Sequence, residues 1–408
     1  MPQLDQRPRA QRPCALVSEH VAGHVLGGYP VVTADRFVTV EGDLVSGQLV
    51  EVRDESDRAR GGWGVWDADE KMVRVLGVGE CGALDLELVR SRVASAIELR
   101  RRLGLMGDGR ALRLLAAEAE GLPGIVADLY GEYVVLHQAS RALEGLTDLV
   151  IDALRESLTL QGIVVKDRAR HSAGSKSERA RIVGQSPPRR LEVREGQFVA
   201  DVHLHGNVNT GLFTDLRLER ERLMEIATDR RALSTFSYTG LLGAALGRGG
   251  ASQVTFVDIA EGMHGWAARN LQLNDLDATD ESRFRFVSVD VLEHMKELHV
   301  AGERFDLVLL DPPTYSAARP SAWSLKRQLP ILVERAIGLL SGPQARIWLA
   351  VTSRAHREDV LVSMVQRGAA AAGSSIEVLA RRGLPPEHPT LACYPRGSYL
   401  KVLELAAS

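Results

Sequence analysis

The segment Phe305-Asp306-Leu307-Val308-Leu309-Leu310, followed by Asp311-Pro312-Pro313-Thr314-Tyr315, decides the fold class of this chain. Its continuous apolar run is typical of a central parallel strand that is buried on both faces. The two prolines fix the backbone and remove two donors, so the strand ends in a rigid turn. Ligands of open α/β sheets bind at the carboxyl ends of the strands. We therefore expect four residues of this turn to face a ligand: Asp311, Pro312, Pro313 and Tyr315. The alternative is a plain proline-rich turn after a buried strand.

A strand–turn–helix–strand unit lies upstream of this turn. A predicted strand, Arg231–Phe236, is followed by the turn Ser237-Tyr238-Thr239-Gly240 and the predicted helix Leu241–Leu246. The second predicted strand, Val254–Val257, ends in Asp258. In such a half-fold glycine lets the backbone approach a ligand, and the acid accepts the ribose hydroxyls. The unit contains no G-x-G-x-x-G motif to hold a pyrophosphate, so a nucleoside such as S-adenosylmethionine (SAM) fits better than NAD.

A third predicted strand, Phe284–Val289, ends in Asp290, which is placed to meet an adenine amino group. Asp258, Asp290 and Asp311 thus end successive predicted strands. This set predicts a methyltransferase core that binds SAM. A rigid Asp-Pro-Pro-x-aromatic turn at this place is how many SAM methyltransferases present a flat nucleobase to the methyl donor.

Composition limits the class of protein. The chain has 408 residues, 45% of them hydrophobic and 25% charged, which is typical of a soluble protein with two or three cores. Its net charge of -3 gives no global signal for nucleic acid, so RNA affinity must come from local basic patches. The cysteines, Cys14, Cys81 and Cys393, are widely separated and predict a reducing cytoplasm without disulfides. Neither the cysteines nor the eleven histidines show metal-ligand spacing, and we expect no metal, signal peptide or membrane span.

The chain divides into a polar arm over residues 1–20, a small β-barrel over 21–105, an α+β unit over 106–190 and a catalytic domain over 191–408. Upstream of the catalytic domain we predict strands at Arg36–Glu41, Gly47–Arg53, Lys71–Leu76, Val134–His137 and Ile163–Val165, and helices at Leu86–Leu103 and Leu143–Leu158. We expect the arm to be disordered. Residues 166–190 form a strongly basic stretch, with Lys166, Arg168, Arg170, Lys176, Arg179, Arg181, Arg189 and Arg190. Such a stretch is usually a solvated surface, but beside a substrate cleft it is suited to phosphates.

Several motifs recur in a fixed order along the chain. They are Ala117–Asp128 (AEAEGLPGIVAD), Asn209–Arg217 (NTGLFTDLR), Phe236–Gly240, Asn270–Asn274, Asp311–Ser316, and His388-Pro389 with Tyr394–Lys401. With these motifs the chain resembles the bacterial large-subunit rRNA methyltransferase I family from about Gly28 to the C-terminus. The resemblance implies a Rossmann-like, seven-stranded SAM methyltransferase domain preceded by a PUA-like β-barrel and a small α+β domain. It also implies methylation of an rRNA base, classically cytosine C5, with SAM as donor and RNA as partner; a homodimer is compatible with it. The SAM pocket it implies contains Thr210, Gly211, Phe213, Asp215, Arg217, Tyr238, Gly240, Asp258 and Asp290.

The chain departs from the family at a chemically important position. Cytosine C5 is activated by a thiolate that adds to C6, so this reaction needs a cysteine. The family carries one in Ser-Cys-Ser at the end of the fifth strand, whereas here Ala345–Val351 leads into Thr352-Ser353-Arg354. Cys393, in a loop after the predicted strand Ser375–Ala380, is the remaining candidate nucleophile, although a small buried hydrophobe is the simpler role. Without a thiolate, direct transfer to a nitrogen such as guanine N7 is accessible, and both acceptor atoms stay open. Two further alternatives remain: the substrate is a small aromatic molecule, or the protein binds RNA without catalysis.

Other residues have two interpretations each. Where the family has Gly-His-Pro-Trp at the barrel entry, this chain has Gly28-Tyr29-Pro30-Val31, and Trp63 and Trp66 are either buried or replacement stacking surfaces. His388 is a general base or pins its loop. Arg217 meets the SAM carboxylate or pairs with a neighbouring glutamate, and Asp215 binds SAM or caps a helix. Asn270 and Asn274 are expected to be structural.

Overall fold

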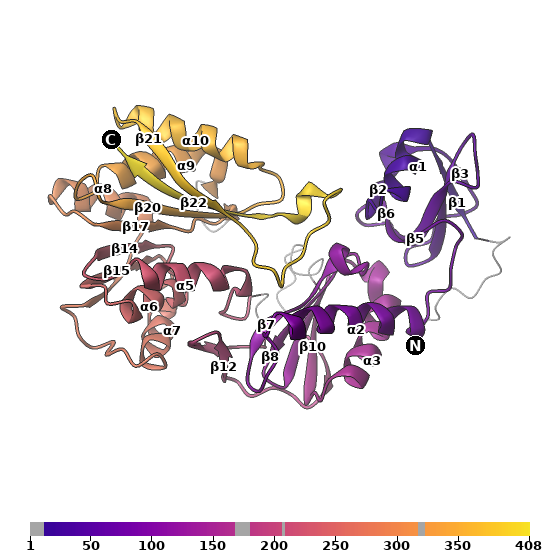
Figure 1. The fold of residues 1–408 in the computed structure, drawn as a ribbon, viewed down its shortest axis with the longest axis horizontal. Coiled ribbons are helices and arrows are strands. Elements are labelled where there is room, and N and C mark those ends of the chain that lie inside the picture. The colour runs from indigo at the N-terminus through magenta and orange to yellow at the C-terminus, as the bar shows by residue number, and fades with distance from the viewer. Residues whose placement is uncertain (1–11, 168–179, 206–208, 317–322) are drawn as a thin grey trace. The chain divides into compact units, whose positions relative to one another are not determined.

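The computed structural model describes residues 12–167, 180–205, 209–316 and 323–408, without the side chains of Tyr315 and Ser316. The chain forms two compact units (Figure 1). The N-terminal unit contains the described residues up to Val193, together with His203–Thr210 and Pro386–Gly397. The C-terminal unit contains Arg194–Val202, Gly211–Pro385 and Ser398–Ser408. Within the described residues no helix is long and apolar enough to cross a membrane.

The N-terminal unit begins with a six-stranded sheet in the order β2-β6-β5-β4-β1-β3. Its elements are β1 Cys14–Val17, α1 Glu19–Leu26, β2 Val31–Thr33, β3 Phe37–Glu41, β4 Leu49–Asp54, β5 Gly61–Asp67 and β6 Met72–Val78. The predicted disordered arm through residue 20 is wrong for its last residues, because β1 pairs with both β3 and β4 and buries Ala15 and Val17. A four-residue strand has little local signal, and its partner residues lie twenty or more residues away.

Strand β5, which the sequence did not predict, explains the glycines and tryptophans of the sheet. A Cβ at Gly64 would lie 2.0 Å from the carbonyl oxygen of Arg74, and one at Gly77 would lie 2.5 Å from Trp63 Nε1. The backbone and the indole therefore need the space that a side chain would take. Trp63 and Trp66 are buried, so they are core residues and not stacking surfaces.

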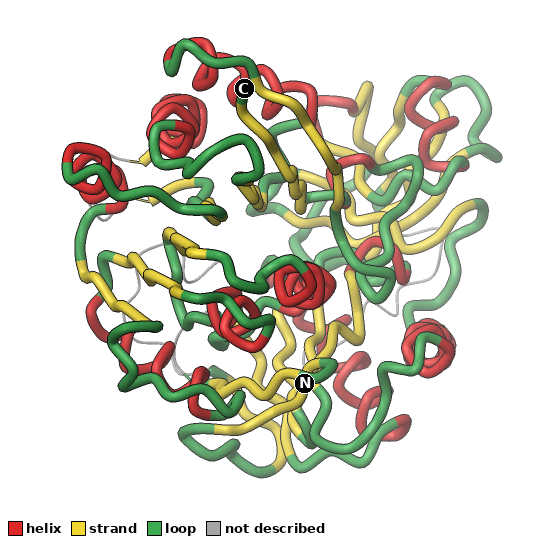
Figure 2. Tube along the Cα trace, turned by 60° about the vertical axis from the view of Figure 1, so that its left-hand side comes forward, coloured by secondary structure: helices red, strands yellow, loops and turns green. Residues whose placement is uncertain are grey.

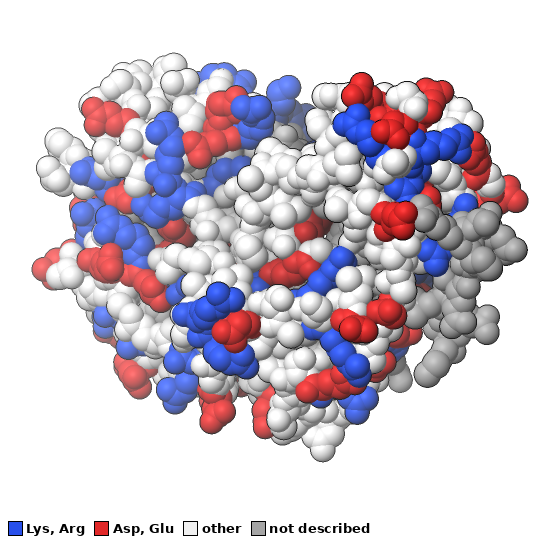
Figure 3. Space-filling model, turned by 45° about the vertical axis from the view of Figure 1, so that its right-hand side comes forward, with Lys and Arg blue, Asp and Glu red and all other residues white. Residues whose placement is uncertain are grey.

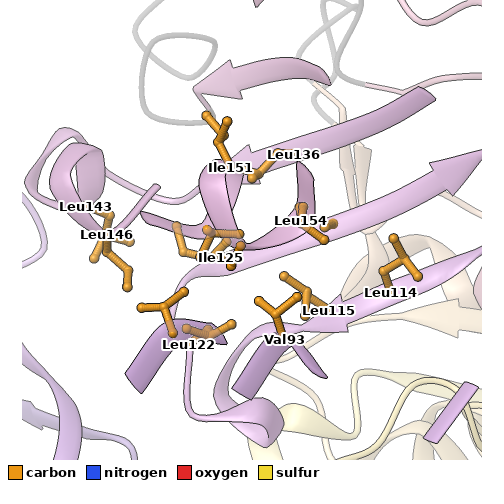
Figure 4. Close-up of a cluster of buried hydrophobic side chains, with 14 of the residues drawn as sticks. Val93, Leu114, Leu115, Leu122, Ile125, Leu136, Leu143, Leu146, Ile151 and Leu154 are labelled. Atoms are coloured by element: carbon orange, nitrogen blue, oxygen red, sulfur yellow. The ribbon is translucent and has the colours of Figure 1, made fainter. Parts of the chain in front are cut away.

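A five-stranded sheet, ordered β11-β10-β9-β8-β7, forms the second part of this unit. Its elements are α2 Leu86–Arg102, β7 Ala111–Ala116, β8 Ile125–Tyr130, β9 Tyr133–Gln138, α3 Glu144–Ser157, β10 Gly162–Asp167 and β11 Arg181–Gly184. Asp85 begins α2 by accepting a hydrogen bond from the Leu88 amide at 2.9 Å. Figure 4 shows the core between the helices and the sheet, where Val93 of α2, Leu136 of β9 and Leu154 of α3 meet.

The C-terminal unit is built on a seven-stranded sheet in the order β16-β15-β14-β17-β20-β22-β21. Its strands are β14 Arg231–Thr235, β15 Gln253–Asp258, β16 Phe284–Ser288, β17 Leu307–Leu310, β20 Arg346–Thr352, β21 Ile376–Arg382 and β22 Leu400–Ala407. The first five strands in this order, β16, β15, β14, β17 and β20, are parallel to one another. Strand β22 is antiparallel to both of its neighbours, β20 and β21. Two small ribbons accompany the sheet, β12 Leu191–Glu195 with β13 Phe198–Val202, and β18 Tyr315–Ser316 with β19 Trp323–Ser324.

Helices cover both faces of this sheet, as Figures 1 and 2 show. They are α5 Arg217–Glu225, α6 Leu241–Arg248, α7 Glu261–Gln272, α8 Val291–Val300, α9 Leu325–Ile337 and α10 Glu358–Ala371. Successive residues of β14 enter different cores: Ala232 packs with α5 and α6, and Leu233 packs with α9 and α10. Both faces of the central strands are therefore buried, which is why their sequences are continuous apolar runs.

Candidate active site

The carboxyl ends of four parallel strands bring the predicted site residues to one edge of the sheet. Thr235, the last residue of β14, pairs with Val257 of β15 and with Leu310 of β17. Asp258 in turn pairs with Ser288, the last residue of β16. The turn after β14 and the acids Asp258, Asp290 and Asp311 consequently share this edge.

Asp258 organises the turn after β14. Its Oδ2 accepts a hydrogen bond from the Tyr238 amide at 2.9 Å, and its Oδ1 accepts one from the Ala260 amide at 3.0 Å. A carboxylate has about four acceptor positions, so these two bonds leave capacity for hydroxyl groups of a ligand.

The turn itself holds strained backbone. Phe236 and Tyr238 adopt left-handed conformations, with φ of 53° and 48°, and Gly240 follows with φ of 76°. Such conformations cost free energy in residues with a Cβ and persist where surrounding bonds impose them, often at functional sites. Besides the Asp258 bond, the Ser237 amide donates to the Val257 carbonyl at 3.1 Å. A Cβ at Gly240 would lie 2.5 Å from Ala267 Cβ, so this glycine is needed for packing the turn on α7.

Gly211 is fixed against the same turn. Its φ is 101°, a Cβ there would lie 2.2 Å from the Trp266 ring, and its carbonyl accepts a bond from Thr239 Oγ1 at 2.7 Å. Trp266 Nε1 donates to the Asp201 carbonyl at 2.8 Å, and Asn270 binds both the Asp201 amide and the Thr239 carbonyl. These contacts join β13, Gly211 and the turn into one rigid assembly.

Asn270 and Asn274 are structural, as expected, and they also bind a second element, β13, that the sequence did not indicate. Asn274 accepts from the Val199 amide at 3.0 Å and donates to the Val199 carbonyl at 2.7 Å. The two asparagines therefore hold β13 along α7, and Asn274 also caps the last turn of α7, because its Nδ2 donates to the Asn270 carbonyl at 2.7 Å.

The remaining residues of the predicted SAM pocket have varied surroundings. Phe213 is 40% exposed, and its ring centroid lies 5.5 Å from that of Tyr238. Arg217 pairs with Glu221 at 3.3 Å. Asp290 caps α8 by accepting from the Glu293 amide at 3.0 Å. Thr210 belongs to the N-terminal unit, where its hydroxyl lies 2.8 Å from Tyr130 Oη.

Asp311 carries the most perturbed carboxyl group of this edge. Burial raises its pKa to about 7, and the nearby charge of Asp215 acts in the same direction. Asp215 is part of a short 3-10 helix, Thr214–Leu216, that leads into α5. A carboxyl group with a pKa near neutrality can both accept hydrogen bonds and take up a proton, which suits acid–base chemistry.

The turn after Asp311 is held to the end of β20. Pro312 is buried, Pro313 is exposed, and the Thr314 hydroxyl donates to the Thr352 carbonyl. The side chain of Tyr315, expected to stack on a base, lies outside the described part of the structure.

Ser353, which stands where the family has cysteine, forms hydrogen bonds with residues that closely follow it in the chain. It is 4% exposed, its Oγ lies 2.9 Å from His356 Nδ1, and it accepts from the amides of Ala355 and His356 at 3.3 Å. Its carbonyl accepts from Lys401 Nζ at 2.5 Å. The hydroxyl therefore holds the turn into α10.

The three cysteines all belong to the N-terminal unit. Burial raises the pKa of Cys14 to about 11 and also raises that of Cys81, which keeps both thiols protonated and poorly nucleophilic. Cys393 is half-buried. His388, in the same segment, is 3% exposed, and Arg100 of α2 donates to the carbonyl of its neighbour Glu387 at 2.6 Å.

Only part of the basic stretch lies among the described residues. Arg168, Arg170, Lys176 and Arg179 lie outside the described residues. Lys166 is 2% exposed, and burial lowers its pKa to about 8, so it is a buried group of β10 and not a surface ligand for phosphate. Arg181, at the other end, pairs with Asp148. On the face shown in Figure 3, basic and acidic side chains are interspersed rather than gathered into one positive field.

Comparison with known proteins defines the class. A family model of S-adenosylmethionine-dependent methyltransferases matches residues 135–402. The chain belongs to this family, and SAM is its methyl donor. Two solved structures share the fold with a TM-score of 0.85, cover 96% of this chain and are themselves covered to 99%: a candidate SAM-dependent methyltransferase from Streptococcus mutans, 19% identical, and a candidate methyltransferase in complex with S-adenosylhomocysteine (SAH), 20% identical.

Curated relatives confirm the resemblance read from the sequence. Ribosomal RNA large subunit methyltransferase I of Aeromonas salmonicida (strain A449) is 29% identical over 391 residues, which cover 94% of this chain and 96% of the relative. The protein of the same name from Salmonella newport (strain SL254) is 27% identical over 397 residues and covers 96% of each chain.

The residues at the sheet edge fit SAM. Ser237 Oγ is buried and has no hydrogen-bond partner among the described residues, so a ligand can supply one. The carboxylate of Asp258 retains acceptor capacity beside it. The sequence did not single out Ser237, Asp201 or Trp266. Ser237 lies in the FSYTG motif, which was the only sequence signal near it. Asp201 and Trp266 act through contacts with residues that are distant in the chain.

Proposed function

We propose that this protein transfers the methyl group of SAM to a base of large-subunit ribosomal RNA. The observation that carries the proposal is the match to rRNA large subunit methyltransferases I over 96% of their length. The rigid Asp311-Pro312-Pro313 turn supports it, because this turn ends a central strand of the SAM-binding sheet. We place the reaction in the cytoplasm.

Each residue of the edge has a role in this proposal. SAM supplies a methyl group on a positively charged sulfur. Asp258 binds the ribose hydroxyls, Asp290 meets the adenine amino group, and Ser237 Oγ binds a polar atom of the donor. Gly211, Phe213, Tyr238 and Gly240 form the wall, with Asp215 and Arg217 at the entrance.

The substrate base is held at the end of β17. Asp311 accepts a hydrogen bond from a base amino group, the Pro312 carbonyl orients the base, and Tyr315 stacks on it. The six-stranded sheet of the N-terminal unit serves as a PUA-like RNA-binding module. Part of the basic stretch, including the exposed Arg189 and Arg190, contacts phosphates.

We infer direct transfer to a base nitrogen, with guanine as the favoured base. Ser353 stands where a thiolate would be needed for cytosine C5, and its hydroxyl is already engaged by His356 and two amides. A hydroxyl is also a much weaker acid than a thiol. Guanine N7 offers an in-plane lone pair and needs no covalent adduct.

The test is transfer of labelled methyl from SAM to unmodified large-subunit rRNA, followed by mass spectrometry of the nucleosides. Methylguanosine is the expected product. 5-Methylcytidine would refute direct transfer but keep the rRNA substrate, and absence of transfer with SAM bound would refute the rRNA substrate.

Replacing Cys393 with serine is expected to leave the rate of methyl transfer within about twofold of wild type. The half-buried thiol has no chemical role in direct transfer. The rate is measured on the same rRNA. A loss of activity in Cys393→Ser while Cys81→Ser stays active would identify Cys393 as a nucleophile.

A further inference from the structure

Trp323 carries a polar group for which the described residues supply no hydrogen-bond partner. Its Nε1 is buried and has no hydrogen-bond acceptor in the structure as described. Buried N–H groups of native proteins are nearly always paired, so an exception needs an explanation. The two other tryptophans of the C-terminal unit are satisfied: Trp266 donates to the Asp201 carbonyl and Trp348 donates to Glu219, each at 2.8 Å.

The position of Trp323 places this donor beside the reacting edge. It begins β19, whose partner β18 directly follows the Asp311–Thr314 turn, and Ser316 pairs with Trp323. Its ring lies edge-on to Phe236, with centroids 5.3 Å apart. Phe236 directly follows β14, and Asp311 directly follows β17. Because these strands are neighbours, their ends are about one strand spacing, roughly 4.8 Å, apart.

The order of the strands separates this donor from the groups proposed for the cofactor. The acids proposed for ribose and adenine end β15 and β16, on one side of β14. The β18–β19 ribbon leaves from β17, on the other side of β14. The ribbon that carries Trp323 therefore leaves the sheet on the β17 side of β14, away from the strands that end in Asp258 and Asp290.

We propose that Trp323 Nε1 donates a hydrogen bond to an acceptor atom, a carbonyl oxygen or ring nitrogen, of the base to be methylated. Trp323 is then a specificity-determining residue that works with Asp311, which accepts from the base. The acceptor follows β17, the donor lies on the ribbon that continues from the same turn, and together they bind two atoms of the base edge. This inference rests on the proposed function, since it needs a nucleobase as substrate.

The decisive variant is Trp323→Phe, which removes the N–H and keeps an aromatic ring beside Phe236. We expect kcat/KM for unmodified rRNA to fall about tenfold, the size of one lost hydrogen bond to a buried group. The Kd of SAH and the melting temperature are expected to stay unchanged. Trp348→Phe is the control, because its N–H serves Glu219 in the core; it should lower the melting temperature and not the kcat/KM of the folded protein.

A second readout observes the donor directly in the wild-type protein. The chain has five tryptophans, and the indole N–H signal lost in Trp323→Phe assigns Trp323 in a nitrogen–proton correlation spectrum. With SAH bound, adding GMP or CMP should move this signal downfield while those of Trp266 and Trp348 stay in place. A shift on adding SAH alone would refute the proposal in favour of a cofactor contact.

The failures of the two proposals are distinguishable. Wild-type transfer to rRNA with unchanged kcat/KM in Trp323→Phe would overturn the role of Trp323 and keep the proposed function. Absence of wild-type transfer would overturn the proposed function, and the spectrum with GMP and CMP would then decide alone: a selective shift supports the base contact, and no shift refutes it.

Discussion

Replacing Asp258 with alanine is expected to weaken SAH binding about 100-fold, as measured by isothermal titration calorimetry. The carboxylate accepts from the Tyr238 and Ala260 amides, and its remaining acceptor positions are proposed to bind ribose. Alanine removes the ligand bonds and also releases a turn in which Phe236 and Tyr238 hold left-handed backbone. The loss should appear in Kd and not in the rate of transfer at saturating SAM.

Two further variants make this prediction specific. Glu261→Gln, an exposed change on the first turn of α7, should keep the Kd of wild type. Asp258→Asn retains one acceptor oxygen and should lie between wild type and alanine. An alanine variant with wild-type affinity for SAH would show that Asp258 is needed for the turn alone and does not contact the donor.

The sequence predicted the catalytic sheet well because parallel, doubly buried strands leave a strong local pattern. The apolar runs that become β14, β15 and β17 end in a polar turn or an acid within one or two residues of the predicted positions. Topology then determines that these ends share an edge, so the candidate site follows from strand order without knowledge of contacts.

Contacts between distant segments explain what the sequence missed. Gly211 needs glycine because of Trp266, and Trp266 is fixed by Asp201, more than sixty residues earlier in the chain. Trp323 packs against Phe236, which lies far earlier in the chain, and its Nε1 has no hydrogen-bond partner among the described residues. Lys166 belongs by sequence to a basic surface stretch, but it lies on β10, between β9 and β11, and is buried there.

The missing cysteine shows how sequence and structure constrain one another. In the sequence, Ser353 stands where the family has its cysteine, so both cytosine C5 and a guanine nitrogen remain candidate acceptor atoms for the methyl group. In the structure the Ser353 hydroxyl stabilises the turn that leads into α10, because it forms hydrogen bonds with the His356 ring and with two backbone amides. A serine that is already fully used locally is a poor candidate for a substitute nucleophile, which favours direct transfer.

Replacing Asp311 with alanine is expected to lower kcat for methyl transfer about 1000-fold while the Kd of SAH stays unchanged. In the wild type, the rate should rise with pH through about 7, because Asp311 accepts a hydrogen bond or a proton only when it is ionised, and burial raises its pKa to that value. In Asp215→Asn the rise should occur at lower pH, since the neighbouring charge that helps to raise the pKa is gone. Rates measured from pH 5 to pH 9 on rRNA test both expectations.

Stability provides a check on the same group that does not depend on the substrate. In the unfolded chain Asp311 has the ordinary pKa of an aspartate, 3.8, whereas the fold raises this pKa to about 7, so the folded state binds the proton more tightly. The free energy of unfolding therefore loses a contribution as pH rises from about 4, and the loss is complete above about 7. Asp311→Asn, which cannot ionise, should be more stable than wild type at pH 8 and equal to it near pH 4 in urea denaturation. Equal stability of the two proteins at pH 8 would mean that Asp311 ionises as freely as in water, and the predicted pH profile of the rate would then have no basis.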